Sequence, residues 1–126
     1  KLPAGWATSL LIVRDGRALF AEASPAVSAV QNILQNTLNV TAWGMTPGES
    51  VQQPMFGAPL YPSQRPMVES TMGEASIAEV ERRGLKVQRV SPWEQEMGSC
   101  HAVHIGADGV LRGAADPRRL GRAAGY

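Results

Sequence analysis

The residues best placed for chemistry stand where a predicted strand turns into the longest predicted helix. Residues 22–28 read Glu-Ala-Ser-Pro-Ala-Val-Ser, and Ser28 is followed three positions later by Gln31. This is a capping-box pattern, so we predict that the helix starts at Ser28. A helix N-terminus offers unpaired backbone N–H groups and a positive dipole end, which suit an anion or a developing oxyanion. An ordinary strand-to-helix turn has the same sequence features, so both interpretations stay open.

Two histidines and one cysteine fall in a later predicted strand. His101 and His104 are three residues apart, and side chains in a strand alternate with a period of two. We therefore predict that they lie on opposite faces and do not share a metal ion. Cys100 and His101 are sequence neighbours that would diverge in a strand, so we interpret Cys100 as a small buried thiol rather than a nucleophile.

Four arginines make the end of the chain basic: Arg112, Arg118, Arg119 and Arg122. Such a group can bind an anion, but Asp108 and Asp116 lie nearby in the sequence, so we expect a solvated tail or local ion pairs. We interpret Asp116-Pro117-Arg118 as a turn in which the aspartate side chain bonds to the backbone.

The elements that must position these residues are predicted from turn and cap signals. Asp15-Gly16 favours a two-residue hairpin between strands at residues 8–13 and 17–23, and the first strand is apolar enough to be covered on both faces. A second hairpin is predicted around residues 107–109, between strands at 100–105 and 110–112. Two further short strands are predicted at residues 68–70 and 86–90, after an irregular crossing over residues 54–66.

Three helices are predicted from apolar spacing and capping patterns. The first runs from Ser28 to about Trp43, with Gly44 after its end. It is predicted from a series of residues at helical spacing, which are Val30, Ile33, Leu34, Thr37, Leu38, Thr41 and Met45. The second is short and begins after a capping box formed by Thr46 and Glu49. The third begins at a box formed by Thr71 and Glu74 and ends near Arg83, before Gly84. The order of elements predicts an α/β fold with helices on sheet faces.

Composition limits the function further. The 126 residues are 44% hydrophobic, enough for one core, so we expect residues 1–126 to form a single domain. The net charge of +1 gives no electrostatic case for nucleic acid or an anionic membrane, and no apolar run approaches the roughly 20 residues of a membrane span. We expect no cofactor. Because the first residue is Lys1, we expect a processed product or a piece of a longer chain.

Taken together, several segments resemble the C-terminal part of the small subunit of γ-glutamyltransferases. The matching segments include Ser24-Pro25 before the long helix, Met97-Gly98-Ser99, and the run that ends in Asp116-Pro117-Arg118-Arg119. Others are residues 13–17, 39–45, 79–87 and 108–115, and the C-terminal Ala-Ala-Gly-Tyr at 123–126. The series keeps the family's order over almost the whole chain.

The resemblance implies part of the αββα sandwich of the N-terminal nucleophile hydrolases. In these enzymes a threonine at the start of the small subunit attacks a γ-glutamyl amide such as glutathione, with its own amino group as the base. The segment that carries this threonine has no counterpart here, and Lys1 offers no hydroxyl group. We therefore expect no catalytic residue in this chain and expect a companion large subunit or N-terminal segment of the same precursor. By resemblance, the compartment would be the bacterial periplasm or cytoplasm.

Some positions depart from the family's pattern. The serine pair that holds the substrate α-carboxylate in the family corresponds to Gly5-Trp6, which removes two hydroxyl donors. The Gly-Gly pair whose N–H groups form the oxyanion hole corresponds to Ala26-Val27. A valine at positive φ is unfavourable, so either the turn has another geometry or the oxyanion hole is lost.

Three hypotheses follow. The first is a divergent amide hydrolase or acyltransferase of this family, acting on a small-molecule amide without the usual amino-acid end, because Trp6 would form an apolar wall. The second is a non-catalytic structural or binding subunit related to the family. The third is a stand-alone fragment that binds a small anion at Ser28.

Overall fold

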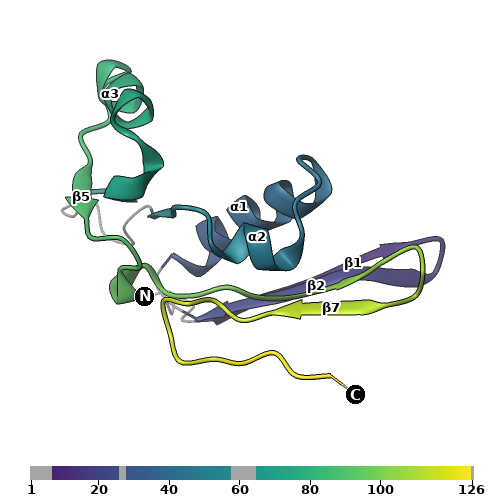
Figure 1. Cartoon of the computed structure of the whole chain (residues 1–126). Coiled ribbons are helices and arrows are strands. Elements are labelled where there is room, and N and C mark those ends of the chain that lie inside the picture. The colour runs from purple at the N-terminus through teal and green to yellow at the C-terminus, as the bar shows by residue number, and fades with distance from the viewer. Residues whose placement is uncertain (1–6, 26–27, 58–64, 126) are drawn as a thin grey trace, which may run out of the picture.

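The computed structural model describes residues 7–25, 28–57 and 65–125 of the chain. The fold is α/β, with two sheets and helices against them, as the order of predicted elements indicated (Figure 1). The strands are β1 (Ala7–Arg14), β2 (Arg17–Pro25), β3 (Phe56–Gly57), β4 (Met67–Glu69), β5 (Gln88–Val90), β6 (His101–Ile105) and β7 (Leu111–Ala114). The helices are α1 (Ala29–Thr41), α2 (Pro47–Val51) and α3 (Glu74–Arg82), with 3₁₀ turns η1 (Ser70–Met72) and η2 (Gln95–Met97).

The larger sheet has four antiparallel strands in the order β1-β2-β6-β7. The predicted hairpin turn between β1 and β2 is confirmed, because Asp15 and Gly16 both have positive φ, 51° and 74°. The smaller sheet has the order β3-β4-β5, and α3 connects the parallel strands β4 and β5. Strand β3 lies within the crossing that we had predicted to be irregular.

Cross-strand register separates the two faces of the larger sheet. Leu11, Ala21, Val103 and Gly113 pair in one row and share a face, and the next row contains the buried Glu22 and Ala102. Helices α1 and α2 lie on one side of this sheet, and the C-terminal tail runs along the other (Figure 1).

The core has two clusters. Phe20, Val40 and Ala102 pack between the larger sheet and α1, with Ile12 beside them. Met55, Met97 and Cys100 form the second cluster. The prediction that the first strand is covered on both faces is wrong for the described residues, because Leu11 is 60% and Val13 is 53% exposed.

Helix α1 buries one part of the predicted apolar series and exposes another. Ile33 is 7% exposed and is buried with three asparagines, which are Asn32, Asn36 and Asn39, whereas Val30 and Leu34 are 64% and 55% exposed. Apolar spacing identified the helix but not the side that packs on the sheet. No helix of the described residues is long and apolar enough to cross a membrane.

Candidate functional site

Buried side chains lie at the end of β2 and at the start of α1. Ser28 is the N-cap of α1, as predicted, and both Ser24 and Ser28 are fully buried. The predicted capping box with Gln31 is wrong, because the Ser28 side chain makes no cap hydrogen bond. Ser28 has φ −94° and ψ 17°, whereas a side-chain cap needs a more extended backbone to reach the N–H groups of the first turn.

Asn32 holds this turn to two neighbouring segments. Its Nδ2 donates to Ser24 Oγ at 3.2 Å and to the carbonyl oxygen of Met97 at 2.8 Å. The end of β2, the first turn of α1 and the 3₁₀ turn η2 are therefore joined through one amide. Within the part of the chain that the structure describes, Ser28 Oγ, Gln31 Oε1 and Asn32 Oδ1 are buried without a hydrogen-bond partner, which leaves three polar atoms at the start of α1 with unused bonding capacity.

A glycine allows the chain to pack closely against Ser28. A Cβ added to Gly57 would lie 2.7 Å from Ser28 Oγ and 3.0 Å from Ser28 Cβ. Any larger residue at this position would push against the start of α1.

Four of the sequence-predicted site residues lie outside the described residues. They are Gly5, Trp6, Ala26 and Val27, so their proposed roles stay predictions.

A buried carboxylate lies one turn further along the same surface of α1. Glu22 accepts hydrogen bonds from Asn36 Nδ2 at 2.6 Å, from the hydroxyl group of Thr37, and from Cys100 Sγ at 3.0 Å. Burial, together with the neighbouring Glu22 carboxylate, raises the pKa of the Cys100 thiol well above its ordinary value. The interpretation of Cys100 as an inert buried thiol is confirmed.

The two histidines lie on opposite faces of β6, as predicted. His104 pairs with the buried Phe20, whereas His101 pairs with the exposed Ala23. Ser99 Oγ lies 3.2 Å from Nε2 of His101. Among residues 7–25, 28–57 and 65–125, no group of three or more His, Cys, Asp or Glu side chains is arranged to hold a metal ion.

Arg118 confirms the predicted local ion pair with Asp116, but it is buried and also binds a distant carboxylate. Its side chain is fully buried and forms ion pairs with Glu69 at 2.6 Å and with Asp116 at 3.1 Å. Its remaining N–H groups donate to the carbonyl oxygens of Val51 and Gln53. Burial lowers the pKa of Arg118, but the ion pairs outweigh it and leave that pKa raised.

Arg112 forms the second predicted local ion pair of the tail. It forms an exposed ion pair with Asp108 at 2.7 Å, and the guanidinium holds the pKa of that carboxyl group well below its usual range. The predicted aspartate turn is also confirmed, because Asp116 Oδ1 accepts the backbone N–H of Arg118 at 2.8 Å. That turn precedes the buried Arg118 side chain, and no sequence pattern indicated its bonds to the distant Glu69.

Comparison with solved structures identifies the class of fold. The γ-glutamyltranspeptidase of Pseudomonas nitroreducens, complexed with L-DON, superposes with a TM-score of 0.77 at 18% identity, over 95% of this chain and 62% of that one. The cephalosporin acylase of Bacillus halodurans gives a TM-score of 0.79 at 22% identity, over 90% of this chain and 21% of that one. At these identities the likeness establishes a shared fold.

Sequence comparison identifies the family. A sequence profile of the γ-glutamyltranspeptidases matches residues 8–126. The glutathione hydrolase proenzyme of Escherichia coli K12 is 29% identical over 121 residues, which are 95% of this chain and 20% of the relative. The chain belongs to the γ-glutamyltranspeptidase family, and it spans a fifth of the length of this curated relative.

Proposed function

We propose that residues 1–126 form one domain, the C-terminal portion of a divergent γ-glutamyltransferase-like amide hydrolase or acyltransferase. Its threonine nucleophile would lie on a segment or companion chain outside these residues. The observation that carries this proposal is the family match over residues 8–126, which accounts for only a fifth of the matching proenzyme.

The side of the larger sheet away from α1 supports a companion. Leu11, Val103 and Leu111 are 60%, 39% and 68% exposed there, although the C-terminal tail runs along the same side (Figure 1), where Ala123 lies close to Gly113. Large exposed apolar side chains that share one face indicate an interaction site. A second sheet stacked on this face, about 10 Å from the first, would complete an αββα sandwich and bury these side chains.

The turn between β2 and α1 would contribute to the reaction through its backbone. The nucleophilic hydroxyl would attack the amide carbonyl carbon and give its proton to the threonine amino group. The resulting oxyanion would accept hydrogen bonds from the N–H groups of Ala26 and Val27, and the amine would then leave with a proton. Water or an amino acid would release the acyl group.

The substrate would differ from glutathione at its amino-acid end. Gly5 and Trp6 offer no hydroxyl group to a substrate carboxylate, so we propose an acyl group without that charge. A non-catalytic subunit is the second candidate, and the replacement of the family's Gly-Gly by Ala26-Val27 favours it.

The experiment purifies the native complex, measures its intact mass and assays two anilides. We expect a companion polypeptide that starts with threonine, serine or cysteine and becomes acylated. We also expect faster release of p-nitroaniline from butyryl-p-nitroanilide, whose acyl group has no carboxylate, than from γ-glutamyl-p-nitroanilide. Family-like rates with the γ-glutamyl substrate would refute the altered specificity, and a complex that hydrolyses neither anilide and is never acylated would favour the non-catalytic subunit.

A further inference from the structure

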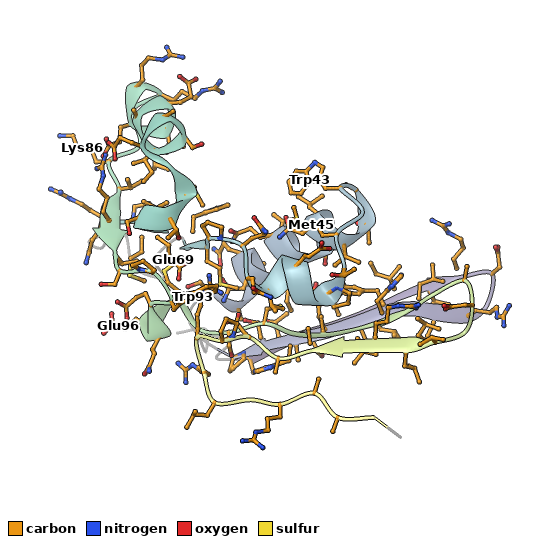
Figure 2. All side chains as sticks on the ribbon, in the orientation of Figure 1. Trp43, Met45, Glu69, Lys86, Trp93 and Glu96 are labelled. Carbon is orange, nitrogen blue, oxygen red and sulfur yellow. The ribbon has the colours of Figure 1, made fainter. Side chains whose placement is uncertain are left out.

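An apolar groove lies on the side of α1 that faces away from the larger sheet. It has a volume of about 710 Å³ and is lined by α1, β3, β4, η1, α3 and the connections around them. Figure 1 shows α3 and β5 standing apart from α1 and α2, and Figure 2 places Trp43 and Met45 on the side of α1 and α2 away from the sheet.

The wall formed by α1 is an apolar ridge. Leu34 and Leu38 line the groove and are 55% and 38% exposed, and Val30, 64% exposed, continues their row at the same interval of four residues beyond the groove. Side chains at this spacing form the ridges that interdigitate when two helices pack. The opposite side of α1, with its asparagines, Ile33 and Val40, is already buried, so among the described residues this ridge is the apolar surface that α1 offers to a partner.

The chemistry of the groove selects an apolar occupant. None of its lining residues is charged, and three of them are methionines, Met45, Met67 and Met72. Charged residues are depleted at the centres of protein interfaces, and flexible methionines line grooves that receive helices. Gln35, one of the few polar lining residues, is already engaged in two hydrogen bonds with the backbone of Phe56, at 2.7 and 3.1 Å.

We propose that this groove receives an amphipathic helix from the companion part of the same precursor, with large aliphatic side chains at positions i, i+3 or i+4, and i+7. This inference rests on the proposed function, which requires such a companion. A second sheet would cover only the opposite face of the larger sheet and would leave this groove open. The matching proenzyme has four-fifths of its length outside the part that this chain covers, which is ample for both contacts.

The test uses photo-cross-linking in the protein assembled from its full precursor. Benzoylphenylalanine is placed at Leu38 in the groove, at Leu11 on the side of the sheet away from α1, and at Val110 in the β6–β7 turn as a control. Val110 is 49% exposed and does not line the groove. We expect the Leu38 probe to link to a helical segment of the companion and the Val110 probe to give at most background.

The outcomes separate the two proposals. The groove proposal fails, and the proposal of a companion survives, if the Leu11 probe links to the companion while the Leu38 probe does not. The same holds if the Leu38 probe links to a second copy of this chain or to a non-helical segment. If neither position links, both proposals fail.

A pair of substitutions supplies a second measurement. Leu34→Glu with Leu38→Glu should weaken association with the companion about tenfold or more, because two buried leucine contacts would be replaced by carboxylates. Val110→Glu, at an exposed position outside the groove, is the matched control and should leave association unchanged. Both leucines are partly exposed, so circular dichroism should show the same secondary structure in every variant. Unchanged association of the double variant would overturn the proposal.

Discussion

The buried guanidinium of Arg118 should contribute more to stability than any other charged side chain of the tail. Its five N–H groups make five hydrogen bonds: two to Glu69, one to Asp116, and one each to the carbonyl oxygens of Val51 and Gln53. Replacing Arg118 by methionine keeps most of the volume of the side chain but leaves two buried carboxylates without their cation. Removing one partner of a buried pair costs about 3–5 kcal/mol.

The assay is chemical denaturation followed by circular dichroism and by tryptophan fluorescence. Trp93 reports locally, because the Arg118 guanidinium lies 5.1 Å from the centre of its ring, and Figure 2 shows Trp93 beside Glu69. Arg118→Met should lower the free energy of unfolding by roughly 3–5 kcal/mol. Arg118→Lys should also destabilise, because a lysine keeps the charge but loses the planar fork of donors.

The matched control is Arg122→Met, at an exposed position of the same tail. Exposed substitutions usually change stability by less than about 0.5 kcal/mol. If Arg118→Met and Arg122→Met gave the same small loss, the ion pairs would contribute nothing net, and our account of the junction would be wrong.

Three further predictions concern local structure. Thr46→Ala should lower the free energy of unfolding by about 1 kcal/mol, measured in urea, because it removes the side-chain cap of α2. Gly57→Ala should cost about 1–3 kcal/mol by pushing against Ser28. In the control Gly48→Ala, the added Cβ would meet only Thr46 Oγ1, at an ordinary contact distance of 4.0 Å, so this substitution should be neutral or stabilising, and equal effects would contradict the contact. The Cys100 thiol should resist iodoacetamide until the chain unfolds. In the folded chain the pKa of this thiol is raised above 9.0, so on raising the pH it ionises first in the unfolded chain. Its contribution to the free energy of unfolding is therefore complete below pH 9.0 and is lost as the pH rises further. Cys100→Ala should reduce that loss, and the same dependence of stability on pH in this variant would contradict the prediction.

The capping patterns show what a short sequence motif can and cannot predict. The box at Thr46 is formed as predicted, because Thr46 has an extended backbone, φ −67° and ψ 157°. The same pattern fails at Ser28, which has the wrong ψ, and at Thr71, which lies within a 3₁₀ turn while Gly73 caps α3. The motif supplies the side chains, but tertiary packing sets the backbone that brings them within reach.

Helix ends with glycine were predicted better. Gly84 has φ 96°. The N–H of Gly84 donates to the carbonyl oxygen of Glu81, and the N–H of Leu85 donates to the carbonyl oxygen of Val80. This is the Schellman pattern, and it depends only on local geometry that glycine adopts easily. Local sequence therefore predicted this end of α3.

The candidate site depended on longer-range contacts, which sequence spacing does not show. Asp116 and Arg118 were assigned to a local turn, and that turn exists, but Glu69 is 49 residues from Arg118 in the chain. Likewise, nothing near Glu22 indicated that Cys100, 78 residues away, would donate to it. A buried charge forms only where such distant partners meet, because a charge without them is too costly to bury.

Helix α1 connects these observations to the proposed assembly. A surface helix normally buries its apolar side and exposes its polar side. In α1 the asparagines are instead held inward by hydrogen bonds to Glu22 and to the carbonyl oxygen of Met97, so the apolar ridge faces outward. The four-stranded sheet likewise leaves an apolar row exposed on its far side. Exposed apolar side chains on two opposite sides of one chain are expected where both sides contact a partner. A partner that covered only one side would leave the exposure of the apolar side chains on the other unexplained.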